Sequence, residues 1–156
     1  MKKLLLALAA AALVGTVTTE AKAQVSFGAQ LSFADETDLG IGARANIGLP
    51  FTGLRVITAF DYFFPDREGL DYFEISGNVA YSIGVPNPAL SPYVGGGLLI
   101  ARTSWDLPEI SRSNTDLGLN LLGGVRFGVG PIKPFAEARF AIVDDSQFII
   151  AGGINF

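Results

Sequence analysis

The chain has 156 residues, carries a formal net charge of −4 and contains neither cysteine nor histidine. The missing cysteine excludes disulfides and a lipoprotein anchor, and the missing histidine excludes Ser-His catalysis and zinc sites of the Cys/His type. We therefore expect no enzymatic activity, no cofactor and no metal site, and no nucleic-acid partner for this acidic chain.

Residues 1–23 have the pattern of a secretory signal peptide. Lys2 and Lys3 precede an apolar stretch from Leu4 to Val14, and Ala21-Lys22-Ala23 places small residues before Gln24. The apolar stretch is shorter than the roughly 20 residues that a membrane-spanning helix needs, which argues against a transmembrane anchor. We predict export, cleavage after Ala23 and one mature domain over residues 24–156.

The rest of the chain alternates between apolar positions and positions held by polar residues or glycine, which is the period of a β-strand. Most of the predicted strands are longer than the roughly 5 to 6 residues usual in globular proteins and match the roughly 9 to 11 of tilted membrane strands. Lipid tolerates no open sheet edge, so an even number of such strands predicts an all-β, eight-stranded antiparallel barrel. The predicted strands are Val25–Phe33, Leu39–Leu49, Leu54–Phe64, Tyr72–Ile83, Tyr93–Trp105, Leu117–Gly128, Lys133–Val143 and Gln147–Phe156.

The connections between these strands alternate in composition. Three of them contain Gly and Pro without charge: 50–53, 84–92 and 129–132. The other four hold most of the chain's 15 acidic residues: Asp35, Glu36, Asp38, Asp66, Glu68, Asp71, Asp106, Glu109, Asp116, Asp144 and Asp145. A soluble meander has no reason to segregate charge in this way. The pattern predicts an up-and-down barrel with short periplasmic turns and acidic outer loops, which are too short for a large adhesive surface.

The isolated charges of the strands share faces with Ser, Asn and Gly. They are Arg44, Arg55, Asp61, Glu74, Arg126, Glu137 and Arg139. Side chains fill the interior of an eight-stranded barrel, and an unpaired charge there is costly. We therefore favour a lumen plugged by arginine–carboxylate pairs, with Glu74 and Glu137 bound to arginines, over a pore lined by the same residues. Glycines leave the facing of Tyr93–Trp105 open, and Arg102 joins this set if that strand faces inward.

Aromatic residues at strand ends suit the two interfacial girdles of a membrane barrel. They are Phe33, Tyr62, Phe64, Tyr93 and Trp105. Alternation alone does not distinguish this arrangement from a soluble barrel with an apolar interior. The strand lengths, the segregated charges and the apolar ending favour the membrane.

Several segments resemble the small outer-membrane β-barrel family, which includes the membrane domain of outer-membrane protein A and the compact protein X barrels. The segments are Pro92-Tyr93-Val94-Gly95-Gly96-Gly97, Lys133-Pro134-Phe135-Ala136-Glu137-Ala138-Arg139-Phe140, and the alternating ending Phe148, Ile150, Gly152, Ile154, Phe156. The resemblance covers residues 24–156. It implies a monomer surrounded by outer-membrane lipid, and it makes Phe156 the signal that the barrel-assembly machinery reads. The family shares a scaffold rather than an activity.

These features favour an outer-membrane barrel with a structural or surface-interaction role and a largely plugged polar lumen. One alternative is a small passive, porin-like channel for water or tiny solutes. A further alternative is a soluble secreted barrel that binds a ligand.

Overall fold

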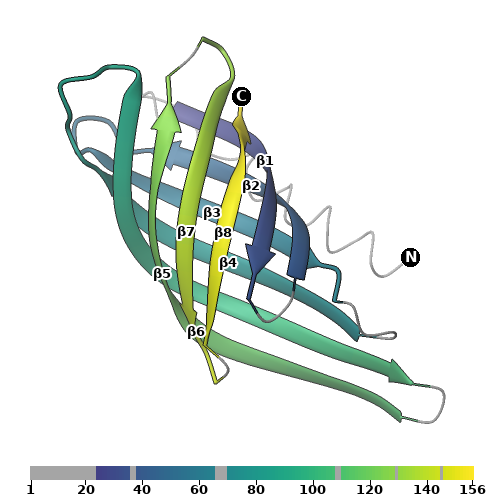
Figure 1. Ribbon diagram of the computed structural model, residues 1–156. Helices are drawn as coiled ribbons and strands as arrows, with labels where there is room; N and C mark the ends of the chain where they lie inside the picture. Colours follow the sequence, from purple (N-terminus) through teal and green to yellow (C-terminus); the bar gives the residue numbers. More distant parts are fainter. Residues whose placement is uncertain (1–23, 36–37, 66–69, 108–109, 129, 145) are drawn as a thin grey trace.

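The computed structural model describes residues 24–35, 38–65, 70–107, 110–128, 130–144 and 146–156. The predicted signal peptide and the loop residues Glu36, Asp66, Glu68, Glu109 and Asp145 lie outside the described residues. The described residues form a closed barrel with the strand order β1 to β8, in which every neighbouring pair is antiparallel and β8 pairs with β1 (Figure 1). The predicted all-β, eight-stranded antiparallel barrel is confirmed. In this part of the chain, no helix has the length and apolar character needed to cross a membrane.

The strand boundaries follow the alternating pattern closely. The strands are β1 Gln24–Ala34, β2 Asp38–Gly48, β3 Leu54–Phe63, β4 Leu70–Ser82, β5 Leu90–Leu107, β6 Ile110–Phe127, β7 Lys133–Ile142 and β8 Gln147–Asn155. Six of them agree with the predicted ranges to within two residues at both ends. The exceptions are β5 and β6, and β6 begins at Ile110 rather than at Leu117.

The barrel has two different ends. The turn end holds the connections 49–53, 83–89 and 128–132 together with Gln24 and Phe156, and the loop end holds the other four connections. A tight turn joins β2 to β3: the Thr52 hydroxyl donates to the Leu49 carbonyl and accepts from the Leu54 amide, while Gly53 adopts a φ of 69°. That left-handed conformation favours glycine.

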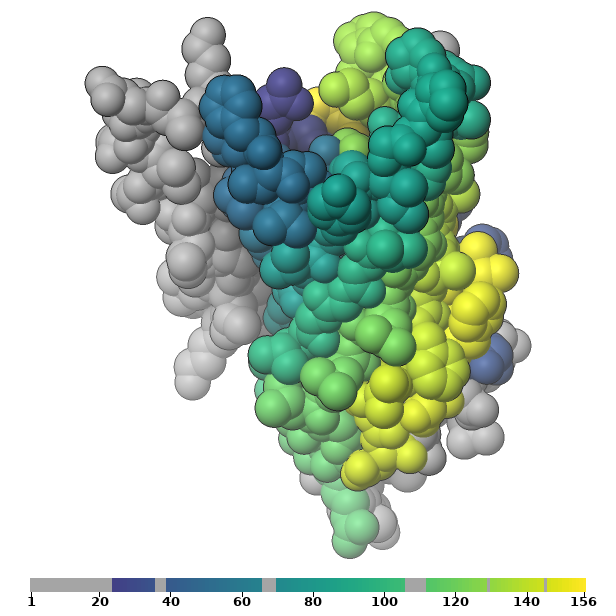
Figure 2. Space-filling view, turned by 90° about the vertical axis from the view of Figure 1, so that its left-hand side faces the viewer, coloured from purple at the N-terminus to yellow at the C-terminus, as the bar shows by residue number. Residues whose placement is uncertain are grey.

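A long hairpin of β5 and β6 extends beyond the other strands at the loop end (Figures 1 and 2). Both strands have 18 residues, and their pairing continues as far as Leu107 opposite Ile110. On its other side, β6 pairs with β7 only from Leu119 onward. Residues 110–117 therefore form a free edge of β6, because β5 is their only strand neighbour within the described ranges.

The sequence suggested a loop between these two strands. The polar residues of that segment are instead paired with each other as part of β5 and β6. Four acidic residues expected in the outer loops lie inside strands instead: Asp38, Asp71, Asp106 and Asp116. A projecting pair of strands thus replaces the short loop expected between β5 and β6, while the absence of a large adhesive surface stays a prediction.

The outside of the barrel is apolar and the inside is largely polar. Exposed apolar side chains occur on every strand, among them Phe27, Ile41, Phe60, Val79, Leu98, Leu119, Phe140 and Ile150. Buried polar side chains alternate with them, among them Gln30, Arg44, Asp61, Asn78, Asn120 and Glu137. Soluble monomers rarely expose continuous apolar patches larger than several hundred Å². A soluble barrel would carry its polar face outside and its apolar face inside, which is the reverse of the observed arrangement.

Candidate functional site

The seven charged residues predicted to face the lumen all lie on the inner face of the barrel. Five are buried: Arg44, Asp61, Glu74, Glu137 and Arg139. Arg55 and Arg126 are half-buried near the turn end. Arg102 is exposed on the outer face of β5, because the inward positions of that strand are those of Tyr93, Leu99 and Ala101. The open question about the facing of β5 is thus resolved, and Arg102 does not belong to the lumen.

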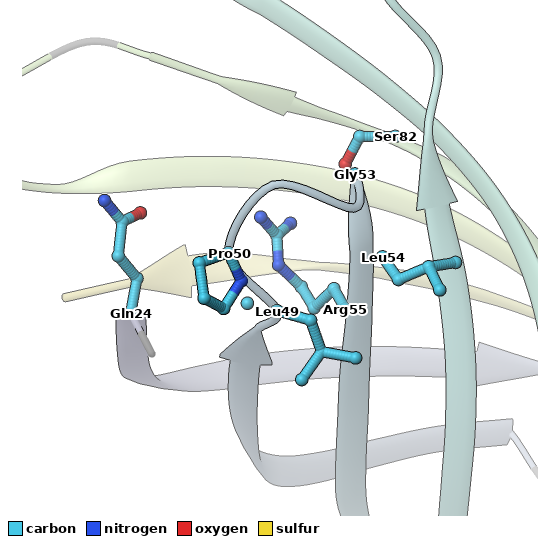
Figure 3. Close-up of a pocket in the computed structure, with 8 residues that line it drawn as sticks. Gln24, Leu49, Pro50, Gly53, Leu54, Arg55 and Ser82 are labelled. Atoms are coloured by element: carbon cyan, nitrogen blue, oxygen red, sulfur yellow. The ribbon is translucent and has the colours of Figure 1, made fainter. Parts of the chain in front are cut away.

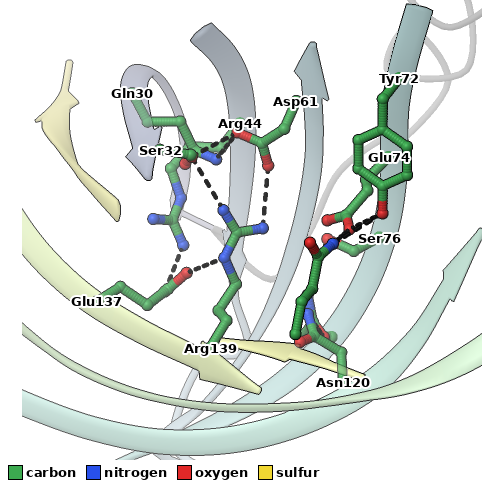
Figure 4. Close-up of polar contacts among 12 residues, drawn as sticks. Gln30, Ser32, Arg44, Asp61, Tyr72, Glu74, Ser76, Asn120, Glu137 and Arg139 are labelled. Carbon is green, nitrogen blue, oxygen red and sulfur yellow. Dashed lines mark hydrogen bonds and ion pairs between the residues drawn. The ribbon is translucent and has the colours of Figure 1, made fainter. Parts of the chain in front are cut away.

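Arg139 and Asp61 form the centre of the lumen network (Figure 4). Arg139 Nη1 donates to Asp61 Oδ2 at 2.9 Å, and Arg139 Nη2 donates to Ser32 Oγ at 3.1 Å. Ser32 Oγ and Gln30 Nε2 both donate to Asp61 Oδ1, at 2.8 and 2.7 Å. The buried charge of Asp61 is thus compensated by one cation and two neutral donors, which is what a buried carboxylate requires.

Glu137 links this centre to a second arginine. Arg44 Nη2 donates to Glu137 Oε2 at 2.9 Å, and Arg139 Nε lies 3.5 Å from Glu137 Oε1, an ion pair without hydrogen-bond geometry. The Tyr93 hydroxyl donates to Glu137 Oε2 at 2.6 Å. The Arg44 guanidinium also stacks over the Phe135 ring, 4.1 Å from its centroid. Glu137 therefore bridges two arginines, as the sequence suggested.

Glu74 has different partners, and the expectation that it pairs with an arginine is wrong. The Tyr72 hydroxyl donates to Glu74 Oε1 at 2.6 Å, and Gln147 Nε2 donates both to that oxygen and to the Tyr72 hydroxyl (Figure 4). None of the ion pairs among the described residues includes Glu74. Neutral donors from β4 and β8 therefore satisfy this carboxyl group.

The lumen also contains apolar layers that the sequence reasoning missed. Toward the loop end, Phe63, Leu99 and Ile149 are almost completely buried and pack with Tyr72 and smaller residues. Toward the turn end, a second group consists of Ile57, Ala80, Tyr93 and Leu122. The available signal was that β3, β5 and β8 each carry apolar residues on both faces. These two clusters place mainly apolar side chains inside the barrel on either side of the ion pairs.

The aromatic girdle is only partly as predicted. Phe33 and Phe64 are exposed on the outer face at the loop end, and Tyr62 packs edge-on against Phe64 with ring centroids 5.2 Å apart. Tyr93 is buried inside the barrel, so its assignment to a girdle is wrong. Trp105 has the same strand parity as the inward residues of β5 but is exposed, because the hairpin extends beyond the other strands there, and its place in a girdle stays a prediction.

Comparison with known proteins supports the architecture. No protein-family model and no curated protein sequence matches the chain. Among solved structures, the N-terminal β-barrel domain of Pseudomonas aeruginosa OprF superposes with a TM-score of 0.73 at 13% identity, over 88% of this chain and 98% of that one. Neisserial surface protein A gives a TM-score of 0.64 at 21% identity, over 84% and 94%. Ail, the attachment invasion locus protein of Yersinia pestis, gives 0.60 at 18% identity, over 88% and 100%.

The chain has the fold of the small eight-stranded outer-membrane β-barrels. Barrels of this size have an interior just wide enough for side chains to fill. In this eight-stranded barrel, an ion-pair network lies between two apolar clusters of the lumen. Two features lie apart from that network: the free edge of β6 at the loop end and the half-buried arginines at the turn end.

Proposed function

We propose that the protein is an outer-membrane barrel that presents its β5–β6 hairpin as an interaction surface above a closed lumen. The free edge of β6, residues 110–117, is the single observation that carries this proposal. A strand edge with unpaired N–H and C=O groups is a template on which another extended chain adds as a strand.

The apolar exterior and the fold support location in the outer membrane. An outer surface of this kind needs lipid around it, and a closed barrel leaves no strand edge unpaired within the hydrocarbon layer. The turn end, with its uncharged connections, faces the periplasm in this arrangement. The loop end and the hairpin then face the outside of the cell.

The free edge lies outside the part of the barrel that lipid covers. Its residues are polar except at the two ends: Ile110, Ser111, Arg112, Ser113, Asn114, Thr115, Asp116 and Leu117. Asn114 Nδ2 donates to both carboxylate oxygens of Asp116 at 2.8 Å, which ties two neighbouring side chains of one face together. A polar edge suits a partner that arrives from water, and we propose an extended polypeptide segment as that partner.

The passive-channel alternative is less well supported. A channel requires a continuous polar path, and the buried layer of Phe63, Leu99 and Ile149 crosses the lumen near the loop end. The ion pairs of Arg139 with Asp61 and Glu137 lie closer to the turn end than that layer. We propose that water and ions do not pass through the barrel.

A shortened hairpin tests the proposal. In the variant, residues 101–116 are replaced by Asn-Gly, which closes Ile100 and Leu117 with a two-residue turn and removes the free edge up to Asp116. Wild type and variant, refolded in detergent, are each panned against a displayed library of unstructured peptides. We expect wild type to enrich peptides of strand-forming sequence that do not bind the shortened protein.

A matched control changes the loop end without touching the hairpin. Asp35→Asn and Asp144→Asn remove two acidic charges from other connections. They should leave peptide binding unchanged if the strand edge binds the peptide. Equal binding to the shortened protein, or loss of binding in the Asp→Asn variant alone, would contradict the proposal.

A further inference from the structure

The charges of the lumen are sorted along the barrel axis. The three lumen carboxylates, Asp61, Glu74 and Glu137, lie in the middle of the barrel or toward the loop end. Arg55 and Arg126 lie near the turn end, opposite Gly48 of β2 and Ser91 of β5, respectively. Within the described ranges, no Asp or Glu side chain lies on the turn side of Glu137, either in the lumen or in the connections.

Arg55 and Arg126 consequently have no anionic partner. The ion pairs of the described residues use Arg44 and Arg139 only. Arg55 is repelled by both Arg126 and Arg44, and Arg126 has a cation–π contact with the Tyr93 ring, whose centroid is 5.9 Å away. Mutual repulsion of partly desolvated cations opposes folding unless an anion is present.

Some buried arginine nitrogens of the lumen also lack acceptors. Arg126 Nε is buried without a hydrogen-bond partner, and so are Arg44 Nε and Nη1. Folded proteins satisfy almost all such groups, and an exception needs an explanation. The three unsatisfied N–H groups come from the two arginines that face the same lumen as Arg55.

A cavity lies beside Arg55, the one arginine among the described residues of its wall. It has a volume of about 260 Å³, and Arg55 projects into it next to the turn that joins β2 to β3 (Figure 3). Gln24 and Ser82 add neutral polar groups to its wall. The space accommodates a small oxyanion with bound water.

We propose that the turn end of the lumen, including this cavity beside Arg55, binds a phosphate group. Arg55 and Arg126 are its charged ligands, Arg44 lies behind them, and Gln24 and Ser82 complete the wall on the side of Arg55. Guanidinium groups bind phosphate oxygens through paired N–H donors, and the negative charge of a phosphate group offsets the repulsion between the two unpaired cations. The phosphate comes either from solution or from the head group of a lipid in the adjacent leaflet.

Titration of the refolded protein with inorganic phosphate in a maltoside detergent, which contains no phosphate, tests the proposal. The measurement is the dissociation constant obtained by calorimetry and by ³¹P line broadening, with chloride at equal ionic strength as the reference. Each charged hydrogen-bonded contact is worth roughly tenfold in affinity. Arg55→Gln and Arg126→Gln should therefore each weaken binding about tenfold, whereas Arg102→Gln, which removes the same charge from the outer face, should leave it unchanged.

A lipid arm identifies the source of the phosphate group. Phosphatidylglycerol is titrated into the same detergent beside a neutral glycolipid. Binding of inorganic phosphate that depends on the two arginines indicates a free anion, and binding of phosphatidylglycerol alone with the same dependence indicates a head group.

The stability of the wild-type protein gives a separate readout that does not depend on whether the variants fold. Phosphate should raise the unfolding midpoint of wild type more than chloride does, because it relieves the repulsion between Arg55 and Arg126. The proposal is overturned if neither phosphate source binds wild type. It is also overturned if Arg102→Gln weakens binding as much as the two lumen variants do.

Discussion

Glu74 and Glu137 are both buried in the lumen, but their surroundings differ. Glu137 balances Arg44 and Arg139, whereas Glu74 accepts hydrogen bonds from Tyr72 and Gln147. A neutral amide can replace a carboxyl group that is bound by neutral donors. It cannot replace one that balances two cations, because removal of one partner leaves a buried charge uncompensated.

We therefore predict that Glu137→Gln destabilises the barrel by about 3 kcal/mol, a size typical of a broken buried ion pair. Glu74→Gln should change the free energy of unfolding by less than about 1 kcal/mol, because its neutral hydrogen bonds can form again. Urea unfolding of the two variants in detergent, followed by tryptophan fluorescence, measures both values. Equal losses of unfolding free energy would show that the ion pairs of Glu137 contribute no more to stability than the neutral hydrogen bonds of Glu74.

Single residues show how far the sequence determines the lumen. Alternation with Ser, Asn and Gly placed Arg44, Asp61 and Arg139 on one face, because a strand has only two faces to choose between. The partner of Glu74 could not be inferred in this way. Gln147 is separated from it by 73 residues in sequence and reaches it only once β8 has closed the barrel.

At the scale of strands, β4 and β5 approach each other closely at Gly97. A Cβ atom at this position would collide with the backbone of Gly77 and with Asn78 Cα, which would be 2.6 Å away. Backbone atoms cannot move aside as a flexible side chain can. A Cβ atom at Gly77, by contrast, would meet nothing within 4 Å.

We predict that Gly97→Ala destabilises the barrel by about 1 to 3 kcal/mol, as overpacking does. Gly77→Ala in the neighbouring strand should be neutral or slightly stabilising, since alanine loses less backbone entropy than glycine. The unfolding midpoints of the two alanine variants make the comparison. A neutral Gly97→Ala would mean that the two strands are further apart than described.

The last two residues of the chain offer a second comparison. The Phe156 side chain is 66% exposed on the outer face, while Asn155 is buried and accepts a hydrogen bond from Asn46 Nδ2 at 2.8 Å. The family resemblance assigns recognition by the assembly machinery to the outer side chain. The inner side chain contributes to the stability of the finished barrel.

We predict that Phe156→Asp lowers the amount of folded barrel in cells severalfold but allows refolding from urea into detergent. Asn155→Ala should do the reverse, lowering the unfolding free energy by about 1 kcal/mol with little effect on cellular yield. Heat-modifiable migration on a denaturing gel measures the folded fraction in both settings. Comparable cellular yields from the two variants would contradict the assigned role of Phe156.

The sequence predicted the presence of all eight strands, but it did not predict the full length of β5 and β6. Apolar alternation identified all eight strands, because it reports which positions face lipid. It stops where β6 extends beyond β7: the side chains of residues 112–115 are exposed on both faces, and the polar residues there indicate a loop in the sequence. Pairing with β5, rather than burial, keeps that segment extended.

The described residues form a barrel with an apolar exterior and a largely polar, buried interior. This combination predicts that the mature protein is recovered in the outer-membrane fraction after cell breakage. It should also migrate faster without boiling, because the barrel stays closed in detergent. Recovery in the soluble periplasm, with no shift on boiling, would contradict the membrane assignment.

Closure of the lumen by its apolar layer and its ion pairs is the central claim about the molecule as a whole. Single-channel recording of the refolded protein in a planar bilayer, beside a general porin, tests it most directly. We predict no resolvable conductance steps from wild type under conditions in which the porin gives steady openings. Large, steady steps that persist unchanged in Glu137→Gln would contradict a closed lumen and would favour a passive channel.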